Sequence, residues 1–124
     1  MHFDQRTQAA LRDAGLSTDE IRAVSEAVVE ATRADADRLE AFFADRETVY
    51  SDMDRAHGTE EFPAHAVEYL DLYTHAAEIR GYLRFDSWGA YVEGGRVLSD
   101  EVVELTLGPT VHDRVRFAAD REEL

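Results

Sequence analysis

The feature that most constrains the fold is a stretch from Ser17 to His57 that contains neither Pro nor Gly. Both residues disfavour a helix interior, so their absence permits a helix of about 40 residues. Apolar residues recur in this stretch with a helical period of 3.6, at Ile21, Val24, Val28, Ala31, Leu39, Phe42 and Phe43. This apolar pattern weakens over residues 35–37, so the sequence permits either one helix over residues 18–56 or two helices with a break.

Signals for helix ends precede this stretch. Residues 3–14 have apolar side chains at helical spacing and are expected to form a first helix, with Gly15 as a C-cap candidate. Ser17 and Glu20 then match a capping box, in which a hydroxyl at the N-cap is followed three residues later by a carboxylate. The second helix is therefore expected to start here.

A third helix is expected from Pro63 to about Ile79, because proline is favoured at the first helical position. Its apolar stripe would consist of Val67, Leu70, Thr74 and Ala77, widened by Tyr69 and Tyr73. Helices of this number and length are typical of a bundle and favour a homodimer over a monomer.

The chain changes character after Gly81, where aromatic and β-branched residues become frequent. Gly94-Gly95 is a two-residue hairpin signal. Residues 100–118 fit a helix or strands equally well, and residues 119–124 are expected to be a frayed tail. We predict one α+β domain over residues 1–124: a bundle of three helices (one long) within residues 1–79, followed by a small antiparallel hairpin or sheet within residues 80–118.

The charge balance indicates an environment. The chain has 27 acidic residues and 13 basic residues, every basic residue is Arg, and the net charge is −14. Self-repulsion of this size destabilises a compact protein in dilute salt but is screened in concentrated salt. A dense carboxylate surface without Lys stays soluble in such salt. We therefore expect a protein of an extreme halophile, located in a potassium-rich cytoplasm.

Several classes of protein are not indicated. The chain has no Cys, so disulfides, thiolate metal sites and Cys nucleophiles are excluded. Residues 1–5 lack the features of a signal peptide, and no apolar run is long enough for a membrane span. Phosphate-binding glycine motifs and the serine-hydrolase elbow are absent as well. No catalytic residue is assigned; a non-enzymatic interaction or regulatory module is favoured, and the alternative is a metal-dependent small-molecule enzyme or a metal-binding protein.

One candidate site is a charged arc on the expected third helix. Successive members of the arc are three or four residues apart: His65, Glu68, Asp71, His75 and Glu78. His and carboxylate at this spacing on a helix can bind zinc or iron, and His57 could contribute. The alternative is an ordinary solvated face, because the arc lies opposite the apolar stripe.

The other candidate is a binding surface in the C-terminal part. Residues 80–118 carry five Arg and six acidic residues, whereas residues 1–79 carry seven and eighteen. Arg, Trp and Tyr are enriched at interfaces, and Arg also binds anions. The expected contact residues for a protein or a small anionic ligand are Arg84, Trp88, Tyr91 and Arg96. The alternative is that strands bury more of their residues and therefore carry fewer acids.

Nucleic-acid binding is not favoured. Residues 11–24 are similar to a helix-turn-helix, with two helices and a short Gly-containing turn. The second helix, however, has no Arg cluster that would meet phosphates.

Three segments carry a family resemblance. They are residues 2–7 (HFDQRT), residues 86–95 (DSWGAYVEGG) and residues 106–117 (TLGPTVHDRVRF). In these segments the chain resembles a family of small acidic haloarchaeal proteins of unknown function. The resemblance covers nearly the whole chain and supports a halophilic origin, but it implies no activity and no catalytic residues.

Overall fold

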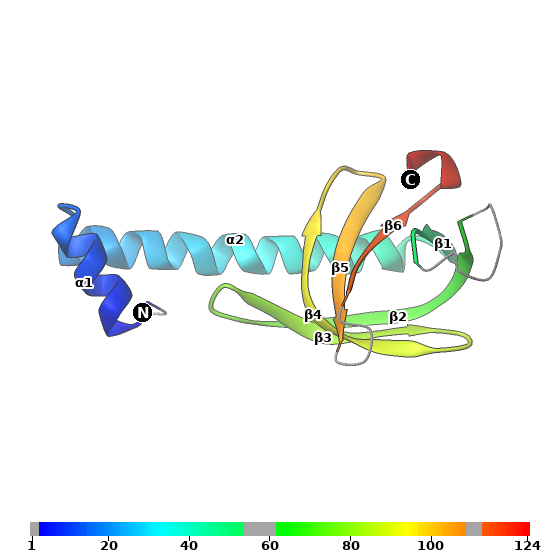
Figure 1. The fold of residues 1–124 in the computed structure, drawn as a ribbon, viewed down its shortest axis with the longest axis horizontal. Coiled ribbons are helices and arrows are strands. Elements are labelled where there is room, and N and C mark those ends of the chain that lie inside the picture. Colours follow the sequence, from blue (N-terminus) through cyan, green and yellow to red (C-terminus); the bar gives the residue numbers. More distant parts are fainter. Residues whose placement is uncertain (1–2, 54–61, 109–112) are drawn as a thin grey trace.

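The computed structural model describes residues 3–53, 62–108 and 113–124. Two helices are followed by six strands that form one closed antiparallel barrel, in which neighbours in sequence pair and β1 also pairs with β6 (Figure 1). The elements are α1 (Gln5–Asp13), α2 (Thr18–Ala44), β1 (Thr48–Ser51), β2 (Ala64–His75), β3 (Glu78–Phe85), β4 (Gly89–Val97), β5 (Val102–Gly108), β6 (Asp113–Ala118) and the short 3-10 helix η1 (Arg121–Glu123).

The first two helices form where the local signals predict them. Gly15 follows α1 with a φ of 100°, as a left-handed C-terminal glycine does. The capping box is present: the Glu20 N–H donates to Ser17 Oγ (3.1 Å), and the Ser17 N–H donates to a Glu20 carboxylate oxygen (3.0 Å). α2 is continuous over residues 35–37 and has 27 residues, a length of about 40 Å. It ends at Ala44, and residues 48–51 form β1 instead of extending the helix.

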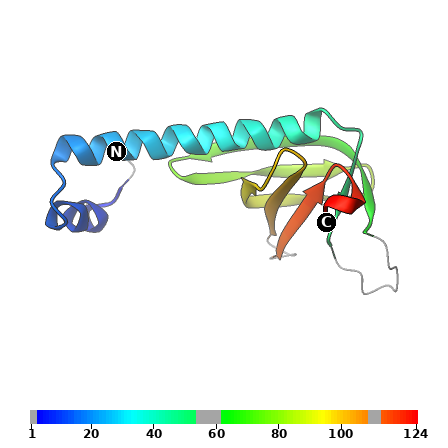
Figure 2. The ribbon, with the colours of Figure 1, turned by 90° about the horizontal axis from the view of Figure 1, so that it is seen from above.

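The core lies between the C-terminal half of α2 and the inner face of the sheet. Leu39, Phe42 and Phe43 of α2 are buried there against side chains from every strand of the barrel. The helix lies along one side of the sheet, and its N-terminal half extends beyond the barrel (Figure 2). α1 lies beside that projecting half and has no buried residue. We call α1 and the projecting half of α2 the helical arm.

The predicted third helix is wrong, because residues 64–75 form strand β2 and residues 78–85 form β3. In β2 the leucines at positions 70 and 72 face the interior and alternate with the exposed Tyr69, Asp71 and Tyr73. This two-residue period is that of a strand. A bulge between Val67 and Tyr69 shifts this alternation by one residue. The inward residues Val67 and Leu70 are consequently three apart, which imitates helical spacing. The boundary between the helical and the strand-containing parts falls near residue 45 rather than at residue 79.

The predicted Gly94-Gly95 hairpin is also wrong, because both glycines lie within β4 and pair with β5. A bulge between Val92 and Gly94 accompanies them. The chain instead turns after β4 over residues 98–101. Residues 102–108 and 113–118 are strands, and residues 119–124 are tied back to the barrel: the Arg121 guanidinium lies 4.6 Å from the Tyr50 ring centroid.

Candidate functional site

The outer surface of β2, β3 and β4 gathers four of the five tyrosines of the chain. In the strand pairing Tyr69 lies opposite Arg84, Tyr73 lies opposite Arg80, and Tyr82 lies between Asp71 and Tyr91. The bulge in β2 places Tyr69 and Tyr73 outside, because without it the alternation would point them into the core. We call this surface the tyrosine face; it consists of Tyr69, Tyr73, Tyr82, Tyr91, Arg80 and Arg84.

Three of the tyrosine rings form a connected row across the strands. The ring centroids of Tyr69 and Tyr82 are 6.4 Å apart, and those of Tyr82 and Tyr91 are 5.4 Å apart with the planes at 77°. Gly89 makes room for this row, since a Cβ there would lie 2.4 Å from the Tyr82 hydroxyl oxygen. Tyr69, Tyr73 and Tyr91 nevertheless remain 44%, 64% and 61% exposed. Such a concentration of exposed aromatic surface is characteristic of binding sites.

The arginines of the tyrosine face are outnumbered by neighbouring carboxylates. Arg84 lies 3.7 Å from a Glu68 carboxylate oxygen, and Arg80 lies 3.5 Å from one of Glu78. Arg80 also donates a hydrogen bond to the backbone carbonyl of Glu93. Because each arginine is paired with a carboxylate and Asp71 lies between them, this face carries no positive surplus for a nucleic-acid backbone.

The structure brings two of the four predicted binding residues together. Arg84 and Tyr91 both belong to the tyrosine face, on neighbouring strands. Trp88 instead turns towards the interior, where its ring centroid lies 4.9 Å from that of Phe85. Arg96 lies further along β4, over β5. The single contact surface that was predicted is therefore divided over three places.

Sequence reasoning missed Tyr69, Tyr73, Tyr82 and Arg80 as members of one surface. Tyr69 and Tyr73 were assigned to the apolar side of a helix. The available signal was the alternation over residues 69–75, where Tyr, Asp, Tyr and His alternate with Leu, Leu and Thr. The pairing with β3 and β4, in contrast, gives no local sign in the sequence.

The metal-binding set is not assembled. His57 lies outside the described residues. His65 faces the interior, Glu68 pairs with Arg84, and His75 is exposed at the far end of β2. The ten residues between the two histidines correspond to about 33 Å along a strand. Within the described ranges, no three His, Asp or Glu side chains are placed to hold a metal ion together.

His65 has a different role, inside the barrel. A hydrogen bond of 2.7 Å joins its Nε2 to the Ser51 hydroxyl, which also accepts from the Met53 N–H. Its ring stacks on Phe85 at a centroid distance of 4.7 Å. Burial lowers the pKa of His65, while the negative charge of Asp86 acts in the opposite direction. Ser and His are also the residue types of a nucleophile and a base. Ser51, however, is fully buried, and its bond to His65 links β1 to β2 in the wall of the barrel.

These features define a small α+β protein with a long helix packed on a closed six-stranded antiparallel barrel and an outer face of exposed tyrosines. No helix in the described part of the chain is both long enough and apolar enough to cross a membrane. Residues 1–122 match a family model described as a family of unknown function, DUF7532. The chain belongs to this family. No curated protein and no solved structure matched the chain.

Proposed function

We propose that this protein is a non-enzymatic interaction module and that the tyrosine face is its protein-docking surface. The observation that carries this proposal is the row of Tyr69, Tyr82 and Tyr91, flanked by the exposed Tyr73. Tyr contributes a large rigid contact area at a small cost in side-chain entropy, and it is enriched among the residues that dominate binding energy. The six strands close on each other, so docking would use the face of the sheet and not an edge.

The occupant that we propose is a second copy of the chain. A two-fold interface needs a surface that complements itself, and the tyrosine face offers Arg80 and Arg84 beside Glu68 and Glu78. In a dimer these four side chains could exchange partners across the two-fold axis. The exposed parts of the tyrosines amount to roughly half of the about 800 Å² that a stable interface needs from each partner. The surrounding charged side chains would supply the rest.

Concentrated salt would favour this association. At the net charge of −14, two copies repel each other in dilute buffer, and screening removes most of that repulsion. We propose accordingly that the protein works in the salt-rich cytoplasm of a haloarchaeon. The absence of Lys and the excess of 27 acidic over 13 basic residues support this setting.

The test compares three proteins in concentrated KCl by size-exclusion chromatography with light scattering. The wild type should have twice the chain mass of 14.0 kDa. The double variant Tyr73→Ser with Tyr91→Ser should have the mass of one chain, because it removes the two most exposed rings of the face. The control Val24→Ser removes an exposed apolar side chain from the helical arm and should remain a dimer.

Two results would count against parts of this proposal. If the double variant stays dimeric and folded, the tyrosine face is not the dimer interface. If the wild type is a monomer and captures a different protein in equimolar amount, with capture lost in the double variant, the docking surface stands and that protein replaces the second copy. A monomeric wild type with no such capture would refute the docking function itself.

A further inference from the structure

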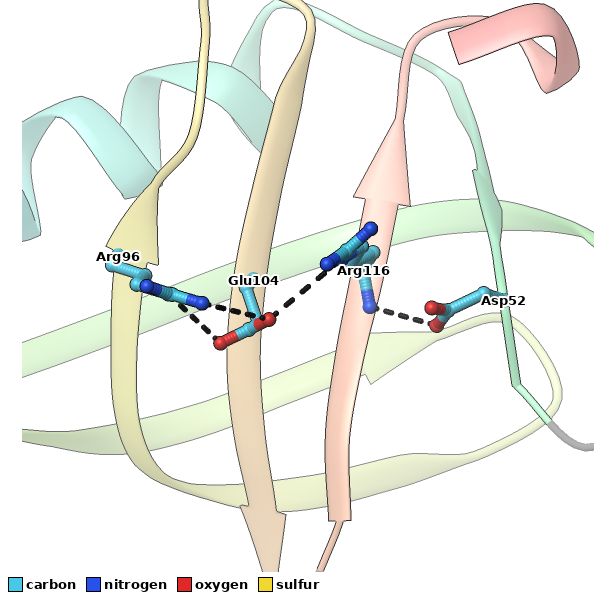
Figure 3. A network of polar contacts seen from close by, with 4 residues as sticks. All are labelled: Asp52, Arg96, Glu104 and Arg116. Atoms are coloured by element: carbon cyan, nitrogen blue, oxygen red, sulfur yellow. Dashed lines mark hydrogen bonds and ion pairs between the residues drawn. The ribbon is translucent and has the colours of Figure 1, made fainter. Parts of the chain in front are cut away.

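A second outer face, formed by β4, β5 and β6, carries an arginine cluster around a buried carboxylate. Arg96, Glu104 and Arg116 lie in one row across the three strands (Figure 3). Thr106 and Arg114 lie opposite each other in the next row. We call Arg96, Arg114 and Arg116 with the central Glu104 the arginine patch. It is separate from the tyrosine face, and the inference below does not depend on the docking function.

Glu104 fixes the orientation of its neighbours. Arg96 donates to its two carboxylate oxygens from Nε (3.0 Å) and from a terminal nitrogen (3.5 Å). Arg116 approaches from the other side at 3.8 Å. The Glu104 side chain is only 10% exposed, whereas Arg96 and Arg116 are 60% and 55% exposed. A carboxylate so buried needs charged partners, and those partners lose rotational freedom before any ligand arrives.

A small hollow opens beside this ion-pair network. It has a volume of about 230 Å³ and is lined by Gly95, Arg96, Glu104, Thr106 and Arg114. Sites for drug-sized ligands and cofactors start at about 300 Å³, so this hollow suits a small anionic group. The bonds to Glu104 use two of the five N–H groups of Arg96, which is one of the residues that line the hollow.

The patch is less acidic than the rest of the protein. Three arginines face one carboxylate in the patch, and Asp52 adds a second at the margin, where it accepts from the Arg116 backbone N–H at 2.8 Å. The patch contains three arginines and two carboxylates, with Glu93 nearby over Gly108, in a chain with a net charge of −14. An anion approaching the protein is therefore repelled less at this patch than over the rest of the surface.

We propose that the arginine patch binds a phosphate monoester group. Arginine forms forked hydrogen bonds with phosphate oxygens, and here Arg96 of β4 and Arg114 of β6 line the hollow on either side of β5. A tetrahedral group accepts donors from several directions, whereas a carboxylate offers two oxygens in one plane. The Thr106 hydroxyl supplies a further neutral donor at the same hollow.

The experiment titrates sodium phosphate into the ¹⁵N-labelled full chain and follows the arginine Nε–Hε resonances by NMR. The resonances of Arg96 and Arg114 should shift and saturate, while that of Arg22 in the helical arm stays unchanged. The variants Arg96→Gln and Arg114→Gln should each weaken binding by about tenfold. Arg22→Gln removes the same unit charge far from the patch and should bind as the wild type does.

Further arms identify the ligand. Glycerol 3-phosphate and a phosphoserine tripeptide distinguish a small metabolite from a phosphorylated protein as the source, and saturable binding of either at Arg96 supports the proposal. Citrate that binds more tightly than phosphate would overturn it in favour of a carboxylate site. Shifts that never saturate, or that are equal at all arginines, would overturn it as well. A normal circular dichroism spectrum for each variant shows that a lost signal is not lost folding.

Discussion

The contact between α2 and β4 at Leu39 and Gly95 allows a sharp test of the fold. Leu39 is fully buried, and a Cβ placed on Gly95 would lie 2.9 Å from Leu39 Cδ1 and 2.8 Å from Leu105 Cδ2. These distances are shorter than real Cβ contacts. Gly95 therefore lies at a close contact between a side chain of the helix and the sheet. The substitutions Leu39→Ala and Gly95→Ala should each destabilise the protein, and their effects should not add.

The magnitudes follow from the packing. Leu39→Ala opens a cavity in the core and should lower the free energy of unfolding by about 3 kcal/mol. Gly95→Ala overpacks the site at a cost of about 2 kcal/mol, reduced by about 0.5 kcal/mol because alanine restricts the unfolded chain. In the double variant the contact with Leu39 is gone and the new methyl group fills part of the cavity. The double variant should thus retain about 1 to 2 kcal/mol more stability than the sum of the single effects predicts.

Urea unfolding followed by circular dichroism and by Trp88 fluorescence measures these free energies. Gly94→Ala provides the matched control, because a Cβ on this neighbouring glycine meets Thr106 Oγ1 at an ordinary 3.7 Å. Its effect should be within about 0.5 kcal/mol and should add to that of Leu39→Ala. If Leu39→Ala and Gly95→Ala also add within about 0.5 kcal/mol, α2 does not pack against β4 as described.

Two further predictions concern solution conditions. Burial lowers the pKa of His65 below its ordinary value of 6.5, so at lower pH the unfolded chain binds more protons at this residue than the folded chain does. The free energy of unfolding should therefore have its full value above about pH 6.5. It should fall as the pH falls towards the folded-state pKa, with a slope of at most about 1.4 kcal/mol per pH unit. Urea unfolding between about pH 5.5 and pH 7.5 should show this slope in the wild type and not in His65→Gln, and an equal slope in both would contradict the assignment. The free energy of unfolding should also rise as KCl increases from about 0.2 M to about 2 M, because screening relieves the self-repulsion of 27 carboxylates, whereas a flat or falling curve would argue against the halophilic origin.

The local sequence signals determined the helical end of the protein. Ser17 and Glu20 define the start of α2, and Gly15 defines the end of α1. Each of these features depends on residues within one or two turns, so a linear sequence is enough to find them. The alternation of apolar and polar residues over 103–107 also indicated strand β5, although a helix fitted this part of the sequence equally well.

Only the tertiary structure decided the path of the remaining strands. Bulges before Tyr69 and before Gly94 interrupt the two-residue period of β2 and β4. In β2 the bulge leaves inward side chains three residues apart, which resembles a helix. In β4 the two glycines beside the bulge resemble a turn. Gly95 is in fact required by Leu39, more than fifty residues away.

The two candidate surfaces have the same origin. The sequence by itself determined that residues 80–118 are less acidic and richer in Arg than the rest of the chain. It could not divide those residues between a tyrosine face and an arginine patch, because that division depends on which strands pair and in which register. Register is set by the packing of the whole core against α2, a property that no short stretch of sequence carries.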